Sequence, residues 1–280
     1  MAEGMNALAK RFGIIAGKGR YPLELAHSAR KAGVQWLGVL AFQGETSPAI
    51  EEQADAVEWV RVGQMQRMID TFQRWSVAEA VMAGQITPGH LFRDVRPDWR
   101  MVKLMAGLKR RNAHTIFGAI AEDLAREGIR LVDSRRYMEE TLATEGVMGR
   151  RKPTAEVVED LRYGFEIAKE VSRLDIGQTV VVKNATVLAV EGFEGTDEAI
   201  RRGAALGRGR ATVVKVSKPK HDARFDVPVV GLTTLEILKE GNIEALGLEA
   251  GLTIMLDRAE FLERADAMKL VVYGLGSGHV

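Results

Sequence analysis

The stretch Thr186-Val-Leu-Ala-Val-Glu-Gly-Phe-Glu-Gly-Thr-Asp197 decides the fold of the C-terminal half of the chain. Its first five residues are apolar or β-branched, which predicts a buried strand over 186–190. Two glycines come next, and Thr196 is placed to cap a helix predicted over 197–205. The turn between strand and helix therefore gathers three acidic residues, Glu191, Glu194 and Asp197.

A second stretch, Lys215-Val-Ser-Lys-Pro-Lys-His-Asp-Ala-Arg-Phe-Asp-Val-Pro228, comes after a β-branched strand predicted over 211–216. Its loop mixes cations with carboxylates, and we expect the two loops to meet at the ends of neighbouring strands. A hard divalent metal takes oxygen ligands, and phosphates need positive charge, so this mixture is typical of a metal site for a phosphate substrate. Solvated loop carboxylates, or acids that stabilise a helix N-terminus, give the same pattern without a metal.

The N-terminal half alternates predicted strands with predicted helices, which indicates a parallel sheet covered by helices. Strands are predicted over 11–16, 34–42, 56–62, 78–83 and 129–132, and helices over 22–32, 63–75, 99–109 and 114–127. Ligands of such sheets bind at the carboxyl ends of the strands. The turns Gly17-Lys18-Gly19 and Gly84-Gln85 lie there, so we expect them to bind phosphates, although tight turns alone also select glycine.

The first glycine turn departs from the dinucleotide fingerprint. Pro22 stands where that fingerprint has a glycine, and the predicted strand over 34–42 ends without an acidic residue for the ribose. A nicotinamide or flavin dinucleotide is therefore not expected.

We divide the chain into a Rossmann-like domain over residues 1–135, a linker over 136–153 and a mixed α/β domain over 154–280. The linker is polar and has no clear period. In the C-terminal domain, Lys183-Asn184 predicts a hairpin between strands over 178–182 and 185–190. The remaining predictions there are helices over 154–174 and 258–269, a helix ending at Glu240 with a capping box in Thr233-Thr-Leu-Glu236, and strands over 252–256 and 270–273.

Composition narrows the possible partners. The 280 residues carry 39 basic and 38 acidic side chains, a net charge of +1, so no global field attracts nucleic acid and we expect none as a partner. The chain has no cysteine, which excludes disulfides and thiolate chemistry. No apolar run reaches the roughly 20 residues of a membrane span, and residues 1–11 lack the apolar core of a signal peptide. We expect a cytoplasmic protein.

Three motifs resemble a known family. They are Asp175-Ile-Gly-Gln-Thr-Val-Val-Val182, Val187-Leu-Ala-Val-Glu-Gly-Phe-Glu-Gly-Thr-Asp197 and Lys218-Pro-x-x-Asp-x-Arg-Phe-Asp-x-Pro-x-x-Gly231. The chain resembles the UDP-2,3-diacylglucosamine pyrophosphatases of the LpxI class, which act in lipid A synthesis in Gram-negative bacteria. The resemblance implies cleavage of this substrate to UMP and 2,3-diacylglucosamine 1-phosphate, a substrate held between two domains, and a homodimer. An acylated substrate also implies loose attachment at the inner membrane.

Specific roles are expected for the residues of these motifs and turns. We expect Mg²⁺ or Mn²⁺ as cofactor, and Asp226 as an essential metal ligand or water-orienting base. The remaining expectations fall into three sets: Asp197, Glu194 and Glu191 as further metal ligands; Asp222, Lys215, Lys218 and Arg224 as catalytic residues; and Gly17, Lys18, Gly19, Gly84, Gln85, Gly195 and Thr196 as substrate-binding residues. A nucleotide-sugar binding protein, or a phosphohydrolase for a different nucleotide diphosphate, remains the alternative.

Overall fold

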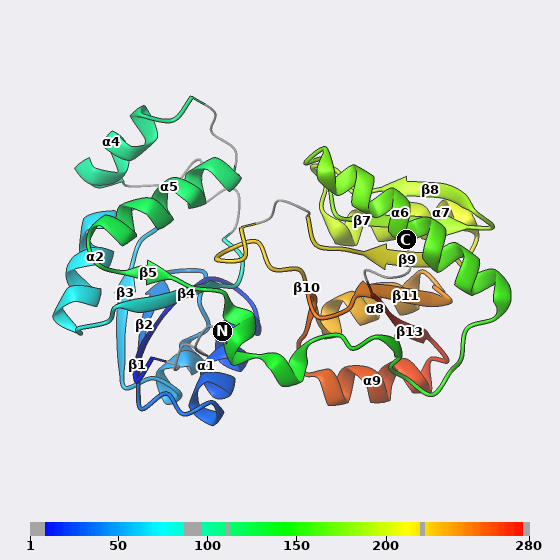
Figure 1. Ribbon diagram of the computed structural model, residues 1–280, viewed down its shortest axis with the longest axis horizontal. Helices are drawn as coiled ribbons and strands as arrows, with labels where there is room; N and C mark the ends of the chain where they lie inside the picture. Colours follow the sequence, from blue (N-terminus) through cyan, green and yellow to red (C-terminus); the bar gives the residue numbers. More distant parts are fainter. Residues whose placement is uncertain (1–8, 87–96, 110–112, 219–221, 277–280) are drawn as a thin grey trace, which may run out of the picture. The chain divides into compact units, whose positions relative to one another are not determined.

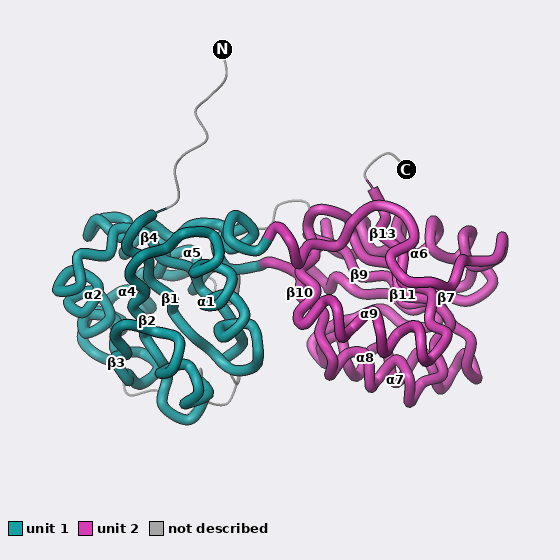
Figure 2. Tube along the Cα trace, turned by 90° about the horizontal axis from the view of Figure 1, so that it is seen from below, with its two compact units in different colours: residues 1–138, 222–226 teal, residues 139–221, 227–280 magenta. Residues whose placement is uncertain are grey.

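The computed structural model describes residues 9–86, 97–109, 113–218 and 222–276. The chain forms two compact units (Figure 2). Unit 1 comprises residues 1–138 together with 222–226, and unit 2 comprises residues 139–221 together with 227–280. The short segment 222–226 therefore belongs with the N-terminal half of the protein, although the chain reaches it from unit 2.

Unit 1 contains a five-stranded parallel sheet in the order β3-β2-β1-β4-β5, with helices packed against it (Figure 1). This order matches the core of a Rossmann fold. The inner strands are almost continuously apolar, as strands covered on both faces must be. The elements are β1 (Arg11–Ala16), α1 (Tyr21–Lys31), β2 (Trp36–Phe42), η1 (Pro48–Glu52), β3 (Ala56–Val60), α2 (Met65–Arg74), β4 (Glu79–Ala83), α4 (Trp99–Ala106), α5 (Ala113–Arg126), β5 (Arg130–Leu131) and η2 (Ser134–Tyr137).

The core of unit 1 joins the sheet to the helices α2, α4 and α5. Leu40 and Phe72 are fully buried in it, and Met101 of α4 is only 8% exposed. Met105 packs partly buried against the same cluster. Both methionines thus serve as core side chains, which is the role that the flexible thioether commonly has.

Unit 2 contains a six-stranded mixed sheet in the order β6-β13-β11-β9-β7-β8 and a small parallel pair, β10 with β12 (Figure 1). Strands β9, β11 and β13 run parallel, whereas β7 is antiparallel to both of its neighbours. The elements are η3 (Glu139–Thr141), β6 (Gly146–Val147), α6 (Ala155–Arg173), β7 (Thr179–Lys183), β8 (Thr186–Val190), α7 (Thr196–Gly207), β9 (Thr212–Lys215), β10 (Val229–Val230), α8 (Leu232–Glu240), β11 (Ala245–Glu249), β12 (Ile254–Met255), α9 (Arg258–Ala267) and β13 (Val271–Leu275).

The sheet of unit 2 is buried on both faces. Helix α6 covers one face, where Phe165 packs with Val180 and Val214. Helices α7, α8 and α9 cover the other, where Phe261 packs in a cluster with Val213. This two-faced burial confirms the α/β class predicted for both halves of the chain.

Several sequence predictions for unit 2 were wrong in detail. The sequence did not predict β11, which lies at the centre of the sheet. Strands β8 and β9 were expected to be neighbours, but β7 lies between them. Helix α8 begins at Leu232 after Gly231, without a side-chain cap, so Thr233-Thr-Leu-Glu236 is not a capping box. The segment predicted as a linker, 136–153, contains η3 and also β6, which pairs antiparallel with β13.

Candidate functional site

The two glycine turns of unit 1 lie side by side at the carboxyl edge of the sheet. Lys18 and Gln85 form a two-way backbone bridge, with N–H to carbonyl distances of 2.6 and 3.2 Å, and the Gly17 N–H donates to the Ala83 carbonyl at 2.7 Å. A Cβ on Gly17 would stand 2.5 Å from the Gln85 carbonyl oxygen, and one on Gly84 2.6 Å from that of Lys18. Both glycines are therefore required by close backbone approach.

The same hydrogen bonds define what the turns can offer a ligand. The N–H groups of Gly17, Lys18 and Gln85 are used within the pair of turns. Gly19 has a φ of +97° and open space around it, and the Lys18 side chain is exposed. These two residues mark the part of this edge that a ligand can reach.

The carboxyl edge of unit 1 also holds polar residues that the sequence analysis missed. Glu45 and Thr46 come after β2 and are each 7% exposed. Thr46 Oγ1 donates to the Ala16 carbonyl at 2.5 Å and accepts from the Phe42 N–H at 2.9 Å, so it joins the ends of β1 and β2. Glu45 lies three residues beyond Phe42, the predicted end of the strand, so it falls outside the position at which the dinucleotide fingerprint has its acidic residue.

Tyr21 and Ser134 form a buried contact between α1 and η2. The Tyr21 hydroxyl donates to Ser134 Oγ at 2.5 Å, and burial raises the pKa of Tyr21 well above its ordinary value. Tyr21 therefore stays protonated and acts as a hydrogen-bond donor that ties α1 to η2.

In unit 2, the ends of β8 and β9 meet through the first residue of the strand between them. Thr179 opens β7 and pairs with Lys215, while the Glu191 N–H donates to the Thr179 carbonyl at 2.8 Å. Thr196 Oγ1 donates to Glu191 Oε1 at 2.9 Å, and Lys215 Nζ donates to Thr196 Oγ1 at 3.2 Å. Glu191 and Lys215 are 9% and 7% exposed, so the expected mixture of acid and cation exists here as a largely buried cluster.

Thr196 does not cap α7, contrary to the sequence prediction. Gly195, at φ of +86°, occupies the N-cap position, and no side chain caps the helix. The hydroxyl of Thr196 is used instead for Glu191 and Lys215. Gly177 packs against the same turn, where an added Cβ would stand 2.0 Å from the Glu191 carbonyl oxygen.

The remaining carboxylates of this turn have separate environments. Arg202 Nη2 contacts Glu194 Oε1 at 2.5 Å, and this hydrogen bond holds the pKa of Glu194 below its ordinary value. Glu194 Oε2 accepts from the Gly192 N–H at 3.1 Å, and Asp197 lies half-buried in the first turn of α7. Among the described residues, no group of three or more histidine, aspartate or glutamate side chains could hold a metal ion.

The segment 222–226 carries three of the predicted catalytic residues and is organised by Asp222. Arg224 donates through Nε to Asp222 Oδ1 at 2.7 Å and through Nη2 to Oδ2, and this pairing raises the pKa of Arg224. The N–H groups of Arg224 and Asp226 donate to the Asp222 side chain and carbonyl at 3.1 and 3.0 Å. The Phe225 ring lies 5.8 Å from that of Phe117 on α5, which anchors the segment in unit 1.

The predicted site residues are thus distributed over both units. Asp222, Arg224 and Asp226 belong to unit 1, whereas Lys215 and Lys218 belong to unit 2 with the acidic turn. Lys218 Nζ contacts Asp175 Oδ1 at 2.8 Å, which links the beginning of the second loop to the first family motif.

Lys169 and Glu249 were missed by the sequence analysis, although they hold the beginning of that loop. Lys169 Nζ lies 2.8 Å from Glu249 Oε1 and donates to the Ser217 carbonyl at 3.0 Å. Glu249 Oε2 accepts from the Ser217 N–H at 2.7 Å. The sequence offered no signal for this cluster, because β11 was not predicted. Along the chain, Glu249 is 32 positions from Ser217 and 80 positions from Lys169.

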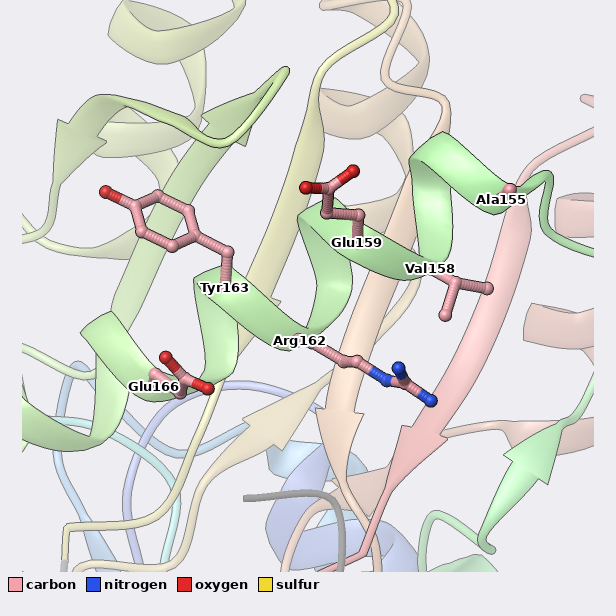
Figure 3. A pocket seen from close by; sticks show the side chains of 6 residues that line it. All are labelled: Ala155, Val158, Glu159, Arg162, Tyr163 and Glu166. Atoms are coloured by element: carbon pink, nitrogen blue, oxygen red, sulfur yellow. The ribbon is translucent and has the colours of Figure 1, made fainter.

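A separate hollow runs along the outer side of α6 and is largely open to solvent (Figure 3). The side chains that line it come from one stripe of the helix, opposite the buried face. None of them is among the predicted site residues. The lining residues are Ala155, Val158, Glu159, Arg162, Tyr163 and Glu166.

No helix of the described residues is long and apolar enough to cross a membrane.

Comparisons with known proteins match nearly the whole chain. A family model described as the LpxI N-terminal domain matches residues 11–141, and one described as the LpxI C-terminal domain matches residues 144–273. The UDP-2,3-diacylglucosamine pyrophosphatase LpxI of Caulobacter vibrioides is 28% identical over 277 residues, which cover 95% of this chain and 98% of that protein.

Similarity to solved structures is weak. The biotin carboxylase subunit of pyruvate carboxylase is 11% identical, with a TM-score of 0.27, over 65% of this chain and 36% of that one. The biotin carboxylase domain of Hydrogenobacter thermophilus 2-oxoglutarate carboxylase is 13% identical, with a TM-score of 0.26, over 70% and 41%. Likenesses of this size carry no conclusion about function.

Proposed function

The chain belongs to the LpxI family, and from this premise we propose that it hydrolyses the pyrophosphate bond of UDP-2,3-diacylglucosamine in lipid A synthesis. The products would be UMP and 2,3-diacylglucosamine 1-phosphate. The observation that carries the proposal is the similarity to a pyrophosphatase with this substrate along 95% of the chain. The ion-paired segment 222–226 supports it, because this segment lies within the third family motif, Lys218 to Gly231.

The reaction needs an attacking water, a base and neutralisation of two adjacent phosphates. Water forms a new P–O bond, the bridging P–O bond breaks, and the proton of the water passes to a base. We assign the base or water-orienting role to Asp226. Its neighbour Asp222 is unsuited to that role because Arg224 occupies its carboxylate.

Positive charge for the phosphates would come from Lys215, Lys218 and Arg224, with Lys18 and Gly19 contributing from the glycine turns. Arg224 is held ionised by Asp222, so it remains a cation at any pH at which the protein is folded. Gly84 and Gln85 support the first turn, and Gly195 with Thr196 forms the corresponding turn in unit 2.

A divalent cation is part of the proposal. Mg²⁺ usually binds one or two carboxylates together with substrate phosphates and water, so it does not require a cage of protein ligands. We propose Asp226 as its first ligand. Glu191 and Glu194 already accept hydrogen bonds from Thr196 and Arg202, so a metal at the acidic turn would have to compete with them. When bound, Mg²⁺ or Mn²⁺ would neutralise charge on the diphosphate.

The decisive experiment compares the wild-type protein with Asp226→Ala in UDP-2,3-diacylglucosamine hydrolysis, with added Mg²⁺ and with EDTA. We expect Asp226→Ala to lower kcat by a factor of about 100 or more with little change in melting temperature. Asp70→Ala is the matched control, because Asp70 is an exposed carboxylate of unit 1 on α2. Near-native turnover by Asp226→Ala would remove Asp226 from the mechanism.

Two further outcomes separate the alternatives. Tight binding of the substrate without cleavage would indicate a nucleotide-sugar binding protein. Faster cleavage of UDP-glucose than of the acylated substrate would indicate a phosphohydrolase for a different nucleotide diphosphate. A homodimer and loose membrane attachment are also proposed from the family, and sedimentation with and without lipid vesicles tests both.

A further inference from the structure

The second loop leaves the sheet of unit 2 at Ser217, two residues after the end of β9. Ser217 is 1% exposed, and both of its backbone polar groups are bound by side chains from other elements. Its N–H donates to Glu249 at the end of β11, and its carbonyl accepts from Lys169 of α6. Lys169 and Glu249 are themselves ion-paired, so the three residues form a closed ring of contacts.

This ring differs from an ordinary surface ion pair. The Glu249 side chain is 7% exposed and that of Lys169 is 27% exposed. Burying a carboxylate costs free energy unless the carboxylate is paired, so we expect Glu249 to have a role that offsets this cost. The Lys169 ammonium and the Glu249 carboxylate both bind the backbone of Ser217 rather than further side chains. Ser217 is the residue at which the chain turns away from the sheet.

The functional part of the loop begins directly after Ser217. Lys218 is the next residue, and after 219–221, which lie outside the described residues, the segment 222–226 belongs to unit 1. The chain returns to unit 2 at Val227, and the carbonyl of the next residue, Pro228, accepts from the Ile254 N–H at 2.9 Å. The Lys169–Glu249 ring therefore fixes, within unit 2, the backbone that directly precedes Lys218.

We propose that Lys169 and Glu249 are positioning residues for hydrolysis, acting through Ser217 on the adjacent Lys218, one of the cations proposed for the substrate phosphates. The inference rests on the proposed function. Loss of the ring would let the start of the loop shift, and a shift of about 1 Å in a reacting group can cost about a hundredfold in rate. The glycine turns belong to unit 1 and are held by their own backbone bridge, so UMP binding there should be unaffected.

The chain offers a matched control next to the other end of β11. Glu244 directly precedes β11 and is 8% exposed, and it is ion-paired with Arg151 and Arg210 at 2.6 and 3.1 Å. Glu244 and Glu249 thus have similar burial at opposite ends of one strand. Of the two, Glu249 is the one that holds the catalytic loop, so Glu244→Gln measures what a lost buried ion pair does to folding alone.

The test measures kcat, KM and melting temperature for Glu249→Gln, Glu244→Gln and the double variant Lys169→Met/Glu249→Gln. We expect Glu249→Gln to lower kcat at least tenfold with a small change in KM, and Glu244→Gln to keep kcat within about twofold. The double variant removes both charges, so its melting temperature should recover towards that of the wild type while kcat stays low. Lys169→Met alone serves if Glu249→Gln does not fold.

Recovery of both turnover and stability in the double variant would overturn the proposal, because the pair would then act only through folding. Equal losses of kcat in Glu249→Gln and Glu244→Gln would overturn it as well. Absence of turnover in the wild-type protein would instead contradict the proposed function.

Discussion

Glu244 shows at the scale of one residue how charge stabilises unit 2. The hydrogen bond from Arg210 holds the pKa of Glu244 below its ordinary value of 4.5, and Arg151 adds to the effect. A lowered folded-state pKa means that the stabilisation is complete above the ordinary pKa and is lost as the pH falls through the folded-state value. The ion pairs of Glu244 should therefore contribute to stability at neutral pH and not in acid.

We predict that Glu244→Gln lowers the free energy of unfolding by about 1–2 kcal/mol at pH 7. Glutamine does not titrate, so the difference in melting temperature between wild type and variant should shrink as the pH is lowered below 4.5. Thermal unfolding at pH 7 and at two acidic values checks this. A difference that stays constant over the whole range would show that packing, not charge, is what the substitution changes.

Individual residues also show which parts of the candidate site could be predicted from the sequence. The sequence placed Glu191 and Thr196 in one turn, because strand ends and glycines are local signals. It expected Lys215 to reach this turn from a neighbouring strand, whereas β7 lies between β8 and β9. The use of the Thr196 hydroxyl was predicted wrongly, since a helix cap and a hydrogen bond to Glu191 require the same residue type. Lys169 and Glu249 gave no signal at all, because their pairing depends on which strands become neighbours.

At the scale of elements, the paired glycine turns of unit 1 depend on Gly84. It adopts φ of +89°, and an added Cβ would lie 2.6 Å from the Lys18 carbonyl oxygen. Gly33 has a similar φ of +98° but no atom within 4 Å of an added Cβ. Substituting either glycine strains the backbone, but only the first substitution forces the two turns apart.

We predict that Gly84→Ala weakens UMP binding by about tenfold or more, while Gly33→Ala loses stability but keeps its affinity for UMP. Titration calorimetry with UMP, together with a melting curve for each variant, provides the measurement. Equal affinities for UMP in both variants would indicate that the glycine turns do not contribute to nucleotide binding.

The regular elements of unit 1 were predictable because strands and helices alternate with strong periodicity. The missed strand, β11, reads Ala245-Leu-Gly-Leu-Glu249 and contains alanine and glycine, which have low strand propensity. Gly247 is nevertheless required there, because an added Cβ would stand 2.7 Å from the side chain of Leu161 on α6. Tertiary packing therefore overrides the local preference, and no local pattern reveals it.

At the scale of the whole molecule, the two units have separate cores. Phe72 is fully buried in the core of unit 1 and Phe261 in that of unit 2. The sequence could indicate two domains, because the chain is long enough for two and a polar stretch interrupts its periodic patterns. It could not indicate that 222–226 joins unit 1, because the contact of Phe225 with Phe117 links residues more than 100 positions apart.

We predict that unfolding followed by calorimetry shows two transitions. Phe72→Ala should lower one and Phe261→Ala the other, each by about 3–5 kcal/mol in the unit that it disturbs. The second variant is the control for the first. A single transition, shifted equally by both substitutions, would mean that the two cores unfold as one cooperative system.

The return of 222–226 to unit 1 bears on how the protein is made. A ribosome releases the first 138 residues well before residue 226, and at about 5–20 residues per second the interval is roughly 4 to 18 s. During that time helix α5 of the nascent N-terminal unit lacks the contact between Phe117 and Phe225. Translation must therefore pass through most of the second half before the first half is complete, and the last piece to arrive is the one that carries Asp226.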